Sequence, residues 1–138
     1  MAQRNAAGFR EIAHTADWEL EVWAPDLAGL FEQAARGMYA LMGIQPLEEK
    51  RISRQLAISA ADPESLLVAF LSELLYQTES EGLFFDSYGI ALEGYHLEAQ
   101  VAGAPISSQS KQIKAVTYHN LEIRESGGRL EANIVFDV

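Results

Sequence analysis

The 138-residue sequence predicts an α+β fold, with two main helices packed on a mixed, largely antiparallel β-sheet in a single compact domain. Two observations predict this class. The expected elements run in the order strands, helix, strand, helix and then about four strands, so the strands gather at the end of the chain instead of alternating with helices. A chain of this length also fits one domain and can bury a core.

The first part of the chain predicts two strands followed by a helix. Residues 9–14 are typical of a short strand, and residues 18–24 alternate with the period of a half-buried strand. Asp26 is the expected N-cap of a helix over 27–42, and Gly43 is its expected stop. One face of this helix carries Leu27, Leu30, Phe31, Ala34, Met38 and Leu41.

A further strand over 51–60 leads into the second helix. Arg54 interrupts the apolar alternation of this strand, which indicates a strand end or an edge. Asp62 is the expected N-cap of the helix, Pro63 its first residue and Gly82 its end. Its apolar stripe is Leu67, Phe70, Leu71, Leu74 and Leu75, and we expect Phe31, Met38 and Phe70 to lie in the core.

The next segment predicts a pair of strands and a loop. Residues 83–92 and 95–103 form the strands, with a tight turn at Glu93 and Gly94 between them. Residues 103–112 are polar and rich in turn-forming side chains, so we expect a mobile loop there.

The C-terminal segment predicts a hairpin. Residues 114–124 and 130–138 alternate as strands do, and Gly127 and Gly128 between them are a good hairpin signal. The strand over 114–124 is unusual because a lysine, a threonine, a tyrosine and a histidine occur within six residues of it. Its polar cluster is either a site or the hydrated face of a sheet.

Composition excludes several classes of site. The sequence contains no cysteine, which excludes disulfides, iron–sulfur clusters, thiolate zinc sites and a cysteine nucleophile. No apolar run approaches the roughly 20 residues of a membrane-spanning helix. The N-terminal residues lack an apolar signal core. We therefore expect a cytoplasmic protein without membrane contact, and its oligomeric state stays open.

The charge of the chain argues against nucleic acid as a direct partner. Twenty acidic and ten basic residues give a formal net charge of −10, whereas nucleic-acid affinity comes mainly from lysine and arginine on phosphates. The acidity serves either solubility or a protein partner with a basic surface.

Strand alternation places three charged residues away from the core. Asp17, Lys114 and Asp137 belong to the phase opposite the apolar one in their strands. They would converge if the three strands are neighbours, which the sequence alone does not show. The apolar phases are Trp18, Leu20 and Val22, then Ile113, Ala115, Thr117, His119 and Leu121, then Leu130, Ala132, Ile134, Phe136 and Val138.

Two histidines are further candidates. His119 falls on the apolar phase, where it is either a partly buried structural side chain or a functional one. His14 lies in "AHTAD", where Thr15 and Asp17 suit a turn that uses their side chains as acceptors.

The two aspartates make a modest case for a metal. Carboxylate oxygens suit Ca²⁺ or Mg²⁺. Asp137 precedes Val138, which carries the terminal carboxylate, and two adjacent anions repel unless a cation or Lys114 lies between them. Nucleophilic catalysis has less support, because no Gly-x-Ser-x-Gly, phosphate-binding glycine loop or His-Glu-x-x-His motif is present.

Four stretches together resemble the archease family. They are "HTADWELEV" (14–22), "LLVAFLSELLYQTESEGLFF" (66–85), "IKAVTYHNLEI" (113–123) and "IVFDV" (134–138). Each is weakly specific by itself, but their order and the length of the chain match the family, so the resemblance implies one archease-like domain over residues 1–138.

The resemblance implies a function that spacing does not show. Archeases are non-catalytic activators of the tRNA-splicing RNA ligase, which joins a 3′-phosphate or cyclic-phosphate end to a 5′-hydroxyl, in tRNA splicing or RNA repair. They promote guanylylation of the ligase's histidine and its multiple turnover. The family's divalent-metal site corresponds here to Asp17, Asp137 and Val138, and Lys114 matches a functional lysine, with His14 and His119 kept as further candidates.

This expectation has rivals. The first alternative is a general chaperone or protein-interaction module, motivated by an acidic surface without a complete catalytic set. A small metal-dependent hydrolase that uses the same carboxylates ranks last, because no general base or activated nucleophile is apparent. Trp18, next to Asp17, is bulkier than is common in the family, and we expect its ring to narrow access to the site.

Overall fold

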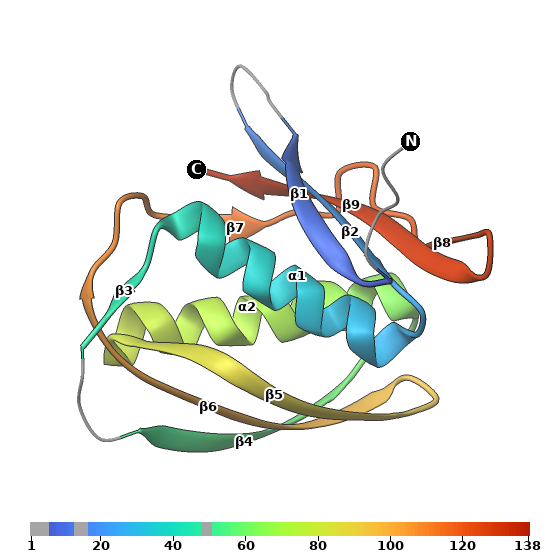
Figure 1. The fold of residues 1–138 in the computed structure, drawn as a ribbon. Helices are drawn as coiled ribbons and strands as arrows, with labels where there is room; N and C mark the ends of the chain where they lie inside the picture. The colour runs from blue at the N-terminus through green and yellow to red at the C-terminus, as the bar shows by residue number, and fades with distance from the viewer. Residues whose placement is uncertain (1–5, 13–16, 48–50) are drawn as a thin grey trace.

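Two helices lie between two antiparallel sheets in the computed structural model, which describes residues 6–12, 17–47 and 51–138 (Figure 1). The predicted α+β class is confirmed. The elements are β1 (Gly8–Ile12), β2 (Trp18–Ala24), α1 (Leu27–Met42), β3 (Gln45–Pro46), β4 (Ile52–Ser59), α2 (Pro63–Glu81), β5 (Leu83–Glu93), β6 (His96–Ser108), β7 (Ala115–Val116), β8 (Arg124–Ser126) and β9 (Arg129–Asp137).

The strands form two sheets, where the sequence predicted one. The first has the order β1-β2-β9-β7, with β8 also paired to β9. In the second, β6 is central, with β4 and β5 along its two sides and β3 at its far end. All pairings of the described strands are antiparallel, so we find no parallel component of the predicted mixed sheet in this part of the chain.

The helix boundaries are those that the capping residues predict. The side chains of Asp26 and Asp62 each accept a backbone N–H bond of 2.7 Å in the first turn of their helix. Gly43 and Gly82 end the helices in the left-handed conformation, which a glycine adopts without a steric penalty. Neither helix within the described residues is long and apolar enough to cross a membrane.

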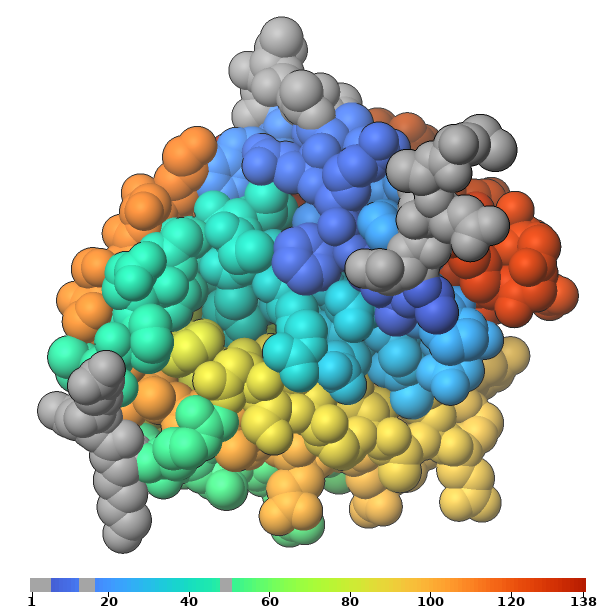
Figure 2. All heavy atoms as spheres, in the orientation of Figure 1, coloured from blue at the N-terminus to red at the C-terminus, as the bar shows by residue number. Residues whose placement is uncertain are grey.

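The core lies between the sheets. The helices contact both of them, α1 through β1, β2, β9 and β5, and α2 through β4, β5 and β7. The sequence led us to expect that the helices cover one face of a single sheet. Instead, they are packed between two sheets. Figure 2 shows α1 crossing one face of the molecule between β1 and β5. Phe31, Met38 and Phe70 are fully buried, as predicted.

Trp23 departs from the predicted alternation of β2. It belongs to the phase of Glu19 and Glu21, yet it is only 7% exposed. Its ring packs over Gly8, where an added Cβ would lie 2.7 Å from a ring carbon, and the Arg129 guanidinium lies 5.8 Å from the ring centroid. The missing side chain at Gly8 gives the indole a covered place outside the main core.

The predicted strand over 114–124 is wrong for most of its length. Only β7 and Arg124, the first residue of β8, pair there, and between them the chain turns away, with Asn120 at a φ of 53°. The cause is the hydrogen bonding of one side chain: the Thr117 hydroxyl donates to the Val135 carbonyl of β9 (2.9 Å) and accepts the His119 N–H in the turn (3.2 Å). Farther along, the Ile123 N–H donates to the Glu64 carboxylate (2.9 Å), which draws the segment towards α2.

The loop predicted over 103–112 is also wrong for its first half, since β6 continues to Ser108. Gly103 allows this, because it lies against the backbone of β5, where an added Cβ would be 1.7 Å from the Phe84 carbonyl oxygen. Beyond it, Pro105 and Ile106 pair with β5 and β3, so polar composition misled the prediction.

Candidate functional site

The strands that carry the predicted site residues are neighbours. β9 pairs with β2 on one side and with β7 on the other, and Phe136 is opposite both Trp18 and Val116. Asp137 is the last residue of β9 and Asp17 directly precedes β2, so each lies one residue beyond this rung at the same end of the antiparallel pair. Opposite residues in such strands have Cβ atoms about 5 Å apart. The sheet therefore brings the two aspartates together at its end.

Both aspartate side chains project from the face of the sheet that points away from the helices. They share the strand phase of Glu19 and Asn133, which is opposite to the phase of the buried Leu20 and Phe136. Asp17 and Asp137 are exposed. Exposure at a sheet end leaves both carboxylates accessible to an ion or a partner.

Glu19 and Asn133 are in a hydrogen-bonded row, whereas the aspartates are not. The Asn133 amide donates to Glu19 (2.6 Å) and accepts from Arg124 (3.1 Å). Within the described residues, neither Asp17 nor Asp137 has a side-chain hydrogen bond or an ion pair. Two neighbouring anions without a partner repel each other, and a cation between them relieves that repulsion.

Val138 follows Asp137 at this end, where the sequence predicts a third carboxylate. Its side chain packs against the core, which holds the chain terminus on the fold. The donor set that the sequence predicts, two aspartates and the Val138 carboxylate, consists of oxygen ligands that fit a hard divalent cation. The described part of the chain contains no group of three or more histidine, cysteine, aspartate and glutamate side chains that could hold a metal ion.

Lys114 contacts this end through its backbone, and its side chain lies on the other side of the sheet. The Lys114 N–H donates to the Asp137 carbonyl oxygen at 2.8 Å. Its side chain lines a groove of about 240 Å³ between β7 and α2, with Leu75, Tyr76 and Glu79. The lysine therefore faces the helices, and the aspartates face away from them.

The phase assigned to residues 113–123 is wrong. Val116 is buried, whereas Ala115 and His119 are exposed, because a strand of two residues followed by a turn does not sustain a period of two. The His119 ring lies 3.2 Å from the Asn120 amide nitrogen in that turn. His14 lies outside the described residues.

Lys111 is a basic residue near this end that the sequence did not single out. Its Nζ lies 4.4 Å from the centroid of the Trp18 ring, within cation–π distance. Alternation puts this ring on the face opposite Asp17, so it does not narrow access to the carboxylates as expected. No sequence pattern pairs these two residues, which are brought together by the sheet and the loop after β6.

Comparison with known proteins identifies similar chains of nearly the same length. Residues 9–138 match the family model described as the Archease protein family. A protein named Protein archease from Methanothermobacter thermautotrophicus is 30% identical over 138 residues, covering 95% of this chain and 99% of that protein. One with the same name from Methanosarcina barkeri is 32% identical, with 94% and 95% coverage.

Solved structures also share the fold. The solution structure of Methanobacterium thermoautotrophicum protein 1598 has a TM-score of 0.73 and 27% identity, covering 95% of this chain and 99% of that one. The crystal structure of an archease from Thermotoga maritima, described as a possible chaperone, has a TM-score of 0.69 and 25% identity, with 94% and 96% coverage.

Proposed function

Because the chain belongs to the archease family, we propose that it is a non-catalytic activator of the RNA ligase that joins a 3′-phosphate or cyclic-phosphate end to a 5′-hydroxyl. Its partner in this proposal is the catalytic subunit of the ligase in the cytoplasm, without direct contact to nucleic acid. The site favours this function because it contains charged groups for positioning phosphates.

The observation that carries the proposal is the pair of aspartates at the end of β2 and β9, which have no side-chain partners among the described residues. Asp17, Asp137 and the Val138 carboxylate would hold Ca²⁺ or Mg²⁺, which supplies a positive charge for phosphate oxygens when bound. In the complex, these exposed carboxylates would face the nucleotide pocket of the ligase. The chain would thereby orient the ligase's nucleotide triphosphate for attack by the ligase histidine, which is a positioning effect.

The lysines extend the same end on its helix side. Lys114 lies in the groove beside α2, and Lys111 is held over Trp18. Each offers an ammonium group that donates hydrogen bonds to phosphate oxygens. Acidic and basic groups on opposite sides of one sheet end suit a pocket that contains both a metal ion and a triphosphate.

A guanylylation assay tests the proposal. Limiting ligase from the same source is incubated with labelled GTP and a divalent metal, with and without this chain. We expect the wild-type chain to accelerate label transfer to the ligase and Asp17→Asn to abolish the acceleration. The matched control is Glu93→Gln, which removes an exposed carboxylate in the second sheet and should activate as wild type does. Full activation by Asp17→Asn with its fold intact would refute the role of the site.

A general chaperone is the second candidate function. It is favoured by the similarity to the Thermotoga maritima protein described as a possible chaperone. It predicts that the chain suppresses heat aggregation of unrelated proteins, measured by light scattering, and that Asp17→Asn suppresses it equally. If the chain activates the ligase but does not suppress aggregation, the chaperone function is excluded and the activator function is the one that remains.

A further inference from the structure

β4 is an edge strand of the second sheet. Among the described strands it pairs with β6 alone. In an antiparallel pair, every second residue directs its N–H and C=O away from the partner strand. β4 therefore presents a row of backbone donors and acceptors along its open edge, which is the template on which a further strand pairs.

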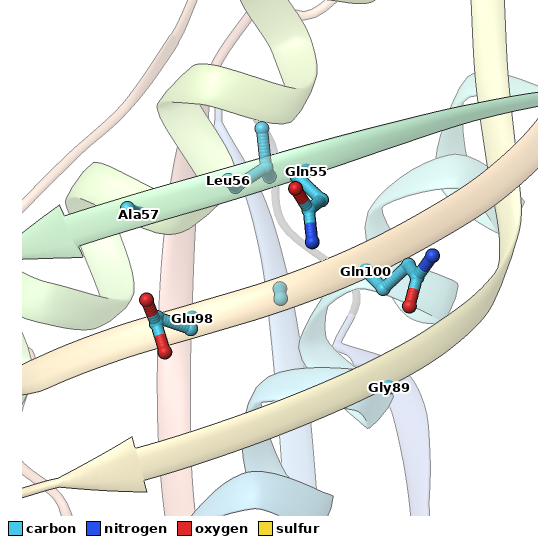
Figure 3. Close-up of a pocket in the computed structure, with 7 residues that line it drawn as sticks. Gln55, Leu56, Ala57, Gly89, Glu98 and Gln100 are labelled. Carbon is cyan, nitrogen blue, oxygen red and sulfur yellow. The ribbon is translucent and has the colours of Figure 1, made fainter.

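Hollows flank this strand on both faces of the sheet. On the outer face, a hollow of about 310 Å³ is lined by Gln55, Gly89, Glu98 and Gln100. Figure 3 shows these residues on the three neighbouring strands of the sheet, with side chains as short as Ala57 between the longer ones. The small residues leave this space open.

The inner hollow, of about 350 Å³, lies between β4 and α2, where Glu73 and Gln77 line it. Both hollows share Gln55, Leu56 and Ala57. Side chains of a strand alternate between its two faces, so a strand added to β4 would direct alternate side chains into the two hollows.

Gln77, which lines the inner hollow, has an acceptor that lacks a donor among the described residues. The Gln77 Oε1 atom is buried and has no hydrogen-bond partner, whereas its Nε2 donates to the Glu73 carboxylate at 3.2 Å. The amide cannot be reversed, because its oxygen would then face the carboxylate. A buried acceptor without a donor destabilises the fold, so a donor that reached this atom from the hollow would be stabilised there.

The charges beside β4 specify which donor fits. Glu73, Gln77 and Glu81 occupy one row along α2, at intervals of four residues. Glu81 is paired with Arg54 of β4 at 3.2 Å, whereas Glu73 has no cation among the described residues. A second lysine or arginine, one or two helical turns along α2 from the Arg54–Glu81 pair, would give Glu73 the cation that it lacks.

We propose that the open edge of β4 binds an extended segment of a partner protein, which pairs with β4 and inserts one lysine or arginine side chain between β4 and α2. The ammonium or guanidinium group bonds to the Glu73 carboxylate and to Gln77 Oε1. The net charge of −10 favours such a basic segment and disfavours a second copy of the chain. This binding site is independent of the proposed ligase activation and lies on a different sheet from Asp17 and Asp137.

The test uses the full chain without ligase and a blocked synthetic peptide of alternating threonine and valine with a central lysine. Its counterparts carry glutamate or norleucine at that position. Backbone amide exchange and chemical shifts are followed by NMR during titration. We expect the lysine peptide to protect alternate amides of β4, those of its open edge, and to bind about tenfold more tightly than the norleucine peptide, the ratio that one desolvated ion pair supplies.

Variants of α2 separate this site from general electrostatic attraction. Glu73→Gln should remove the preference for lysine, whereas Glu79→Gln, a change of equal charge in the groove beside β7, should retain it. Equal binding of all peptides, or protection outside β4, overturns the proposal. The chain is also studied at high concentration without peptide. Protection of the β4 amides from exchange, together with a doubled mass in solution, would overturn the proposal and assign the edge to a second copy of the chain.

Discussion

Single residues differ in function here according to whether their charge has a partner. Glu19 accepts a bond from Asn133, and Asp86 at a bulge of β5 pairs with Arg51. Asp17 and Asp137 have no such partner in the described part of the chain, although they are adjacent. Carboxylates that are close, exposed and unpaired are available for a cation.

Metal binding should therefore stabilise the folded chain. We expect Ca²⁺ or Mg²⁺ to raise the melting temperature, because a ligand of the native state adds about 2.7 kcal/mol at a hundredfold excess over its dissociation constant. Asp137→Asn should eliminate the shift, and Glu93→Gln should keep it. Calorimetric scans over a metal titration measure this, and a shift equal in all three proteins would place the ion elsewhere.

At the scale of elements, capping residues and close approaches decide which segments fold and where they end. Asp62 fixes the start of α2 by a bond from the Ser65 N–H. Gly103 allows β6 to pass against β5. Both residues act on backbone groups, so their effects are larger than those of ordinary surface residues.

The Asp62 cap should make stability depend on pH. The Ser65 N–H bond to the carboxylate lowers the pKa of Asp62. A pKa that is lower in the folded state gives stability that is present above the unfolded pKa and is lost as pH falls through the folded pKa. We expect the melting temperature of wild type to exceed that of Asp62→Asn at neutral pH and the difference to shrink in acid.

The comparison between these two proteins controls for all other carboxylates, since both proteins contain them. Thermal melts followed by circular dichroism over a range of acidic pH values supply the measurement. A difference that stays constant down to the lowest pH at which both proteins fold would contradict the role of the charged cap.

Gly103→Ala should strongly destabilise the chain. The added Cβ would meet the Phe84 carbonyl oxygen at 1.7 Å, so two paired strands would have to separate. We expect a loss of about 3 kcal/mol or more, which is the range of severe backbone strain and overpacking. Gly89→Ala is the matched control in the same sheet, with its nearest atom at 3.8 Å, and should change the free energy of unfolding by less than about 0.5 kcal/mol. Urea denaturation measures both, and equal effects would refute the close approach.

For the whole molecule, the arrangement of the two sheets separates the candidate surfaces. The helices lie between the sheets, so the aspartates at the end of the first sheet and the edge strand β4 of the second are on separate elements. The charge of −10 acts over both. Long-range attraction therefore favours basic protein partners over nucleic acids.

The chain alone should not bind RNA. Phosphates are repelled by a net charge of −10 unless lysines and arginines cluster locally. We expect no change in the fluorescence anisotropy of a labelled single-stranded RNA at physiological salt. Saturable binding that weakens with added salt would contradict this and would direct attention to Lys111 and Lys114.

Local patterns in the sequence determined the elements that depend on local physics. Both helices start and end at the predicted caps, because capping is a contact between residues three or four apart. Strand β2 has the predicted bounds, and the hairpin glycines Gly127 and Gly128 adopt positive φ angles as expected. These contacts join residues that are only a few positions apart in the chain, so the sequence alone is sufficient to infer them.

Tertiary structure alone decided the remainder. It made β2, β9 and β7 neighbours, which brings Asp17 beside Asp137. It also ended the strand after Val116 and placed Lys114 towards α2. These outcomes depend on hydrogen bonds between distant residues, such as Thr117 with Val135 and Ile123 with Glu64. Alternation along one strand reports which residues share a face, but only the pairing of strands decides which side of the molecule that face meets.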